Sequence, residues 1–280
     1  AHGGAHSPAT HGDTKDSRRS ATEQPESIGQ HLFLGVSPAF LREYYTEHGF
    51  DEDTPTVEVS AKVREWAEGT ALSVAEANEE RTTANGHRAV ETATLFVSHA
   101  QSCSFYNLLE AVDVYISLHK MKRETTYLWL DVFCIRQHEI ARDVRHIGAV
   151  VAAIGQVVVV LKPWDDPVCL SRVWCLYEVM HTQINPGVKL ALTMSPDERL
   201  NFLRAIRHDM RGVQESLVSF DAREAEASVY SDKEMIFTLI CDNFGDDEAG
   251  VDPFDEFNNV VRNAVRNAVA GFSWQYKGDA

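Results

Sequence analysis

The chain has 280 residues, of which 44% are hydrophobic, and a formal net charge of −16. This apolar fraction is ordinary for a globular protein, so one large domain, or one domain with an extension, can form a core. The negative charge argues against a nucleic-acid partner and against docking on an anionic membrane, since both need a concentrated basic surface. No apolar run approaches the roughly 20 residues of a spanning helix, so membrane insertion is not expected.

The five cysteines stand at positions 103, 134, 169, 175 and 241. Their odd number and lack of paired spacing favour reduced thiols over a disulfide framework, which suits the cytoplasm or another reducing compartment. No CxxC or clustered Cys/His spacing is present, so no metal site is expected. Because the chain begins at Ala1 without a methionine, it could be a trimmed product from which a targeting segment was removed.

The first 90 residues are expected to form two different segments. Residues 1–30 are rich in Gly, His, Ser, Thr and Pro, which predicts a disordered or extended tail. Residues 31–90 carry helical signals, among them the pair Ser37-Pro38, an N-cap followed by proline in the first turn. An alanine-rich helix is also expected from 70 to 81. Residues 31–90 therefore predict a helical extension that packs on the main domain.

From residue 91 onward, short apolar runs alternate with segments of helical periodicity. Five runs predict strands, at 94–97, 127–133, 157–161, 188–192 and 216–220. This alternation predicts an α/β fold, an open parallel sheet with helices on both faces, and five strands favour the flavodoxin-like order. We expect the domain to cover residues 91–245, with a C-terminal helix within 246–280 packing on it.

In the flavodoxin-like order, the loops after the first and third strands lie side by side at the point where ligands bind. These loops, 98–102 and 162–170, carry Ser98, His99 and Trp164. A cleft is therefore expected here. His99 could act as an acid or base near neutral pH. A histidine that follows a strand can also simply cap the loop, and this second interpretation is preferred.

Trp174 and Glu178 are four residues apart on the helix predicted after the third strand, so their side chains point the same way. A carboxylate beside an aromatic ring in such a crevice can stabilise a developing cation or orient a sugar hydroxyl. The alternative is structural: Glu178 pairs with Arg172 or solvent, and Trp174 packs. Periodicity alone favours the structural alternative.

Residues 171–178 (SRVWCLYE) resemble the S-x-W-C-L-x-E-L segment of Toll/interleukin-receptor (TIR) domains, especially those of plant immune receptors. Residues 95–99 (LFVSH) and 128–131 (LWLD) stand where such domains have their first and second strands. The chain is also similar to TIR-like proteins of unicellular algae and protists, which carry a WLD-x-FC-x-x-QH run and a PWDDP loop. The resemblance covers residues 93 to about 245.

Some TIR domains cleave the nicotinamide–ribose bond of NAD with a glutamate on the helix after the third strand. The resemblance therefore implies Glu178 as the catalytic residue and NAD as substrate or ligand, without a metal. Bond cleavage passes through an oxocarbenium-like state, as in glycoside hydrolysis, and a nearby carboxylate can stabilise it. The residues expected to bind the dinucleotide are Ser98, His99, Asp131, Trp164 and Trp174.

Other TIR domains are non-catalytic modules that assemble through TIR–TIR contacts. Two hypotheses therefore remain open: an NAD nucleosidase, and a signalling scaffold or assembly subunit that acts through contacts with other protein chains. A nucleotide-binding sensor without turnover is a third. An open cleft at Glu178 favours the enzyme, whereas a cleft filled by residues 1–90 or by a partner favours the scaffold.

Overall fold

The computed structural model describes residues 28–227, 229–245 and 250–275. Its strands form one six-stranded sheet in the order β2-β1-β4-β3-β5-β6. The strands are β1 (Leu34–Val36), β2 (Val90–Thr92), β3 (Leu95–Ser98), β4 (Leu128–Trp129), β5 (Gln156–Val160) and β6 (Lys189–Thr193). Strands β4, β3, β5 and β6 run parallel, whereas β1 pairs antiparallel with β2 and β4. The protein is thus an α/β protein with a mixed, mostly parallel sheet.

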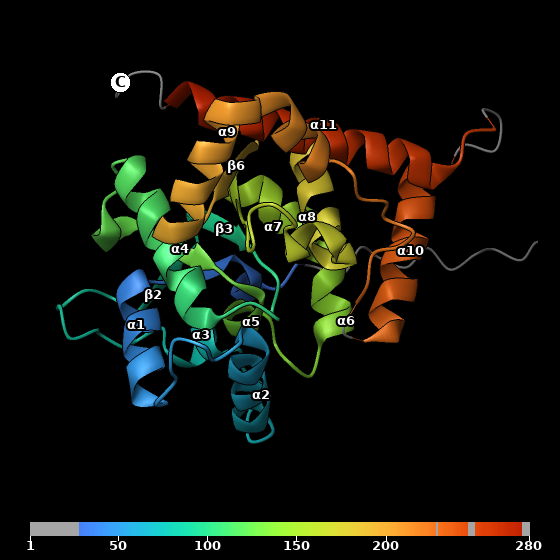
Figure 1. Ribbon diagram of the computed structural model, residues 1–280. Helices are drawn as coiled ribbons and strands as arrows, with labels where there is room; N and C mark the ends of the chain where they lie inside the picture. Colours follow the sequence, from blue (N-terminus) through green and yellow to red (C-terminus); the bar gives the residue numbers. More distant parts are fainter. Residues whose placement is uncertain (1–27, 228, 246–249, 276–280) are drawn as a thin grey trace, which may run out of the picture.

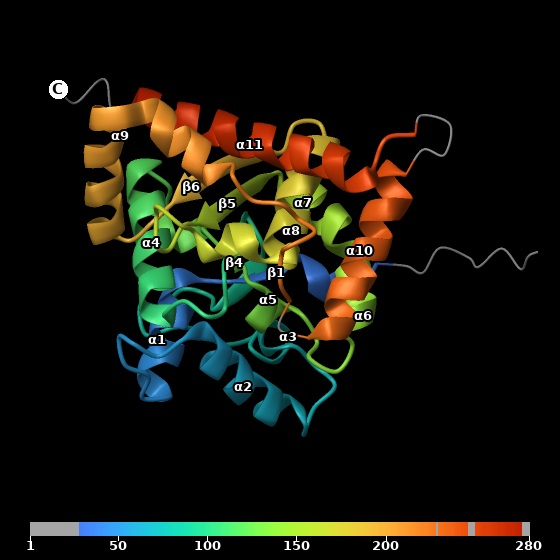
Figure 2. The ribbon, with the colours of Figure 1, turned by 45° about the vertical axis from the view of Figure 1, so that its right-hand side comes forward.

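Helices cover both faces of this sheet. They are α1 (Pro38–Glu47), α2 (Thr56–Ala67), α3 (Val74–Ala77), α4 (Phe105–Leu118), α5 (Asp131–Cys134), α6 (Ile140–Asp143), α7 (Ile147–Ile154), α8 (Val173–Ile184), α9 (Pro196–Leu217), α10 (Tyr230–Phe244) and α11 (Pro253–Gln275). Helices α4 and α9 lie on one side and α7, α8 and α10 on the other, while α11 packs on α8, α9 and β6 (Figures 1 and 2). In the described part of the chain, no helix is long and apolar enough to cross a membrane.

Three predicted strands are confirmed, as β3, β5 and β6. In β5 the residues Val157, Val158, Val159 and Val160 are all buried, which explains its continuous apolar run in a sheet covered on both faces. Gly155 ends α7 in the left-handed region, at a φ of 71°, a conformation that glycine adopts without strain. The chain can therefore turn directly from α7 into β5.

The predicted fifth parallel strand, at 216–220, is wrong. Helix α9 continues to Leu217, and the next residue, Val218, is its C-cap. Val213 and Leu217 are both buried and lie one turn apart, so the apolar positions here continue a helical stripe. A short apolar run at a helix end cannot be told from a strand by periodicity.

The second predicted strand, 127–133, is shorter than expected. Strand β4 has only two residues, and Asp131 begins the short helix α5. The Asp131 carboxylate accepts a hydrogen bond from the backbone N–H of Val132 at 2.8 Å, which satisfies a donor in the first turn. The chain therefore bends into the loop region sooner than the apolar run indicated.

Residues 31–90 contain the expected helices α1 and α2, and also strand β1 and the first residue of strand β2, neither of which we expected. Strand β1 packs closely against Ala93. A Cβ at residue 35 would lie 2.9 Å from the Cα of Ala93, so glycine is needed there. The Trp129 indole N–H also donates to the carbonyl of Leu32 at 2.9 Å. The helix expected at 70–81 is reduced to the four residues of α3. The tail predicted at 1–30 lies outside the described residues except for its last three.

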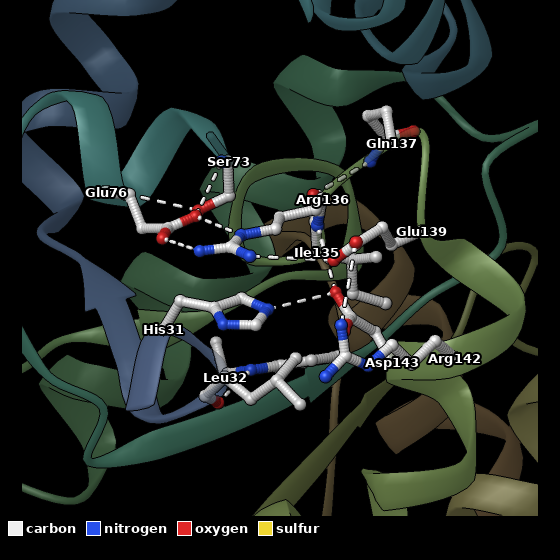
Figure 3. A network of polar contacts seen from close by, with 11 residues as sticks. His31, Leu32, Ser73, Glu76, Ile135, Arg136, Gln137, Glu139, Arg142 and Asp143 are labelled. Carbon is white, nitrogen blue, oxygen red and sulfur yellow. Dashed lines mark hydrogen bonds and ion pairs between the residues drawn. The ribbon is translucent and has the colours of Figure 1, made fainter. Parts of the chain in front are cut away.

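A buried polar network joins this N-terminal segment to the loop after β4 (Figure 3). His31 Nε2 lies 3.1 Å from Asp143 Oδ2, and the same carboxylate oxygen accepts from the backbone N–H of Arg136 at 3.2 Å. The Arg136 guanidinium donates to both carboxylate oxygens of Glu76, at 2.9 and 2.5 Å. The network fixes the loop immediately before Gln137, a residue of the site described next.

Candidate functional site

A cavity of about 140 Å³ lies at the carboxyl ends of β3, β4 and β5. Its floor comes from the loop after β3, from Asp131 and from α8, and its outer walls come from α2 and α10. The first and third parallel strands along the chain, β3 and β5, are neighbours in the sheet, as the predicted switch point requires. The loop after β5 contributes through residues from Arg172 onward rather than through 162–170.

Glu178 lies on this cavity and is almost completely buried, with 7% of its surface exposed. It belongs to α8, whose residues Val173, Leu176 and Met180 are fully buried. Burial raises the pKa of Glu178 to about 8; the Ser98 hydroxyl opposes the rise and the charge of Asp131 adds to it. Near neutral pH the carboxyl is therefore mostly protonated.

Trp174 lies one turn before Glu178 and lines the same cavity, so the expectation that both face one way is confirmed. The Trp174 side chain also lies close to the carboxyl of Asp232, a residue of α10 on the same cavity. Burial raises the pKa of Asp232, and the Trp174 side chain opposes the rise. An aromatic ring and two carboxyl groups, from α8 and α10, therefore line one cavity, an arrangement that suits a cationic ring.

His99 and Asp131 face each other across the next part of the cavity. The distance from His99 Nε2 to Asp131 Oδ1 is 3.9 Å, too long for a hydrogen bond, and Nε2 has no hydrogen-bond partner although it is buried. Gln101 Nε2 donates to Asp131 Oδ2 at 2.7 Å, and the Cys175 thiol donates to the carbonyl of His99 at 3.3 Å. The loop is thus held in place while the imidazole nitrogen stays available.

Ser98, the last residue of β3, is completely buried behind Glu178. Its Oγ neighbours the Glu178 carboxyl and the Cys175 thiol but forms no hydrogen bond of good geometry with either. A buried polar atom without a partner costs about 1–3 kcal/mol. Two such atoms, Ser98 Oγ and His99 Nε2, therefore belong to neighbouring residues. His99 lines the cavity, where a polar ligand could satisfy its nitrogen, whereas Ser98 does not line it.

Of the predicted site residues, Ser98 and Trp164 do not line the cavity, and Trp164 packs elsewhere. Its ring packs on Phe202 at a centroid distance of 5.6 Å, and its backbone N–H donates to Glu198 Oε2 at 2.9 Å. It does not line the cavity. The proline and aspartate pattern around Trp164 correctly indicated a sharp loop. It did not indicate on which side of the loop the Trp164 ring lies.

Several residues on the cavity were not predicted: Ser60 and Arg64 from α2, Gln101, Gln137, and Asp232. Gln101 stands in the loop that we expected to bind a ligand, so its position was a usable signal. Asp232 lies in the first turn of α10, where an acidic residue is common for reasons of capping alone. Ser60 and Arg64 are distant in sequence from the domain that the resemblance covers, so only the tertiary structure reveals them.

Neither metal nor thiolate chemistry has support at this site. In residues 28–227, 229–245 and 250–275, no group of three or more His, Cys, Asp or Glu residues could hold a metal ion. Burial raises the pKa of the Cys175 thiol well above its ordinary value, so the nucleophilic thiolate is disfavoured. The carboxyl, imidazole and indole groups remain as the chemically useful ones.

No family model, no curated protein and no solved structure matches this chain. The interpretation of the site therefore depends on its own geometry.

Proposed function

We propose that the protein is a TIR-like domain that binds an NAD-type dinucleotide in the Glu178 cavity and hydrolyses its nicotinamide–ribose bond. One observation carries the proposal: a buried carboxyl lies at the switch-point cavity beside a buried imidazole nitrogen, His99 Nε2, that lacks a partner. The order β4-β3-β5-β6 gives the first four positions of the flavodoxin-like arrangement, in which ligands bind at this edge. The segment SRVWCLYE, which resembles TIR domains, carries the carboxyl.

The charges of the cavity suit this substrate. The nicotinamide of NAD is a pyridinium cation, and cleavage moves the positive charge onto the ribose as the C–N bond breaks. The bond's electron pair goes to the departing nicotinamide nitrogen, and water adds its oxygen to the ribose carbon. The proton that the water loses can go to the carboxylate of Glu178. A bound cation favours the ionised carboxylate, so binding should release the proton that burial otherwise retains on Glu178.

The cavity size suits one end of the ligand. Its volume of about 140 Å³ is below the range of roughly 300–1,000 Å³ for pockets that enclose drug-sized ligands. The nicotinamide riboside end would therefore occupy the floor, and the remainder would extend along the opening between α2 and α10. The described residues of the N-terminal segment contribute to the wall without filling the floor.

The test is NAD turnover, with nicotinamide and ADP-ribose identified as products. Wild-type protein is expected to turn over NAD, and Glu178→Gln to lose at least about 100-fold in rate, the scale on which removal of a single electrostatic stabiliser acts. Glu215→Gln on α9 is the matched control, because that carboxylate is 65% exposed and pairs only with its own helix neighbour Arg211 in the described chain. Absence of wild-type turnover, with assembled forms also assayed, would refute the enzyme proposal.

A second candidate is the scaffold, because apolar residues are exposed beside the cavity. Val229 lines it and is 52% exposed, and the next residue, Tyr230, is 74% exposed. A partner chain covering them would bury both. If the scaffold is right, Tyr230→Ser will weaken self-association or partner binding in light scattering, and NAD will not be consumed.

A further inference from the structure

Helix α2 is firmly attached to the loop that forms the cavity floor. The backbone N–H of Thr56 donates to the carbonyl of Cys103 at 2.9 Å, and that of Val57 donates to the carbonyl of Gln101 at 2.7 Å. These two donors belong to the first turn of α2, whose N–H groups have no partner within the helix. The helix therefore has a fixed position relative to the site.

The side of α2 that faces the cavity carries a hydroxyl and a guanidinium. Ser60 and Arg64 are four residues apart, so they lie on the same face, and both line the cavity. Ser60 is 2% exposed, whereas Arg64 extends into solvent at the opening. Arg64 Nη1 donates to Ser60 Oγ at 2.7 Å, and Arg64 forms no ion pair with any residue that the structure describes. The hydroxyl hydrogen of Ser60 is left to donate to a ligand.

Charge divides the cavity into two parts. The floor and the α10 side carry the carboxyl groups of Asp131, Glu178 and Asp232 together with Arg172, whereas α2 presents Arg64 and no carboxyl group. The chain carries a net charge of −16, so its overall field does not attract anions. An anionic group of a ligand therefore needs a local cation. A ligand that suits both parts has a cationic end for the floor and an anionic group for α2.

We infer that α2 provides a phosphate subsite, in which the Arg64 guanidinium and the Ser60 hydroxyl bind the phosphate groups of the dinucleotide. The planar guanidinium matches the geometry of phosphate oxygens, and it can bind two of them at once. The inference deepens the proposed function, on which its choice of ligand depends. It makes the segment 31–90 part of the binding site, outside the region that resembles TIR domains.

The experiment measures affinities for inorganic pyrophosphate, ADP-ribose and nicotinamide riboside by calorimetry. Arg64→Gln should weaken pyrophosphate and ADP-ribose binding by about tenfold or more, and should leave nicotinamide riboside, which has no phosphate, within about twofold. Lys62→Gln is the matched control: Lys62 stands on the same helix, pairs with Glu65 at 3.5 Å and does not line the cavity. Ser60→Ala should produce a smaller loss for the same two phosphate ligands.

Three outcomes would overturn the subsite. These are equal losses in Arg64→Gln and Lys62→Gln, no loss in Arg64→Gln, and no binding of pyrophosphate or ADP-ribose by the wild type. Because Arg64 is exposed on a helix, its replacement by glutamine should leave the melting temperature within a few degrees. Failure of NAD turnover alone would leave the phosphate affinities, and hence this inference, intact.

Discussion

Two regions of this protein bury the same kinds of polar side chain in opposite ways. In the network of Figure 3, the His31 ring points at the Asp143 carboxylate, and the Arg136 guanidinium forms two hydrogen bonds with the carboxylate of Glu76. At the Glu178 cavity, the His99 ring nitrogen has no partner, and neither has the hydroxyl of the preceding residue, Ser98, which is fully buried. Paired groups hold a structure together, whereas unpaired groups beside a cavity are what a ligand can bind. The comparison separates a structural polar cluster from a candidate site without any appeal to sequence motifs.

The largest expected effect is on the network. Asp143→Ala should lower the free energy of unfolding by about 3–5 kcal/mol, because it leaves the His31 ring and the Arg136 N–H buried without their acceptor. Urea unfolding measures the change, with Asp166→Ala as the control because Asp166 is exposed in a loop. A loss below about 1 kcal/mol would mean that the network is not structural.

The next effect concerns Glu178, whose pKa is about 8 in the folded protein and near the ordinary value of 4.5 when unfolded. Between these values the folded state holds a proton that the unfolded state has released, so stability falls as pH rises through this window. The slope approaches about 1.4 kcal/mol per pH unit, or about 2–3 kcal/mol between pH 5.5 and 7.5. The unfolding free energy of Glu178→Gln should lack this slope. The stability of the variant relative to the wild type should therefore increase with pH. A difference in unfolding free energy that stays constant with pH would contradict the raised pKa of Glu178.

His181 provides the opposite slope on the same helix. Burial lowers its pKa to about 4, and neither ring nitrogen has a hydrogen-bond partner. Below pH 6.5 the unfolded state binds a proton at this histidine that the folded state does not bind. Stability is therefore lost as pH falls from about 6.5 toward 4. The expected loss is about 1–2 kcal/mol between pH 7 and 5, and His181→Leu should abolish it. Acid unfolding curves of the two proteins would test this, and parallel curves would count against it.

The smallest expected effect tests the difference between the two regions most sharply, because the same change, serine to alanine, is made once in the network and once beside Glu178. Ser73 Oγ accepts from Glu76 N at 3.2 Å in the capping box of α3, so Ser73→Ala should lose about 1 kcal/mol. Ser98 Oγ has no partner, so Ser98→Ala should gain up to about 1 kcal/mol. Thermal unfolding of the two variants measures the sign of each stability change. If Ser98→Ala destabilises as Ser73→Ala does, the distinction between the regions fails.

The sequence was informative where local patterns decide the structure. Strand β5 could be predicted from its valine run, and the shared direction of Trp174 and Glu178 followed from their spacing on α8. Strands β1 and β2 have three residues each and depend on partners far away along the chain, so no local periodicity indicated them. For the same reason Arg64 could not be assigned to the site: only the packing of α2 on the loop after β3 brings it there.

The most direct measurement is a structure of the Glu178→Gln protein with NAD, since this variant should bind the dinucleotide without cleaving it. The proposal predicts the nicotinamide riboside end at residue 178, hydrogen bonds of about 3 Å from the ligand to His99 Nε2, and phosphate oxygens at Arg64. An empty cavity at saturating NAD, or NAD bound away from Trp174 and residue 178, would contradict it.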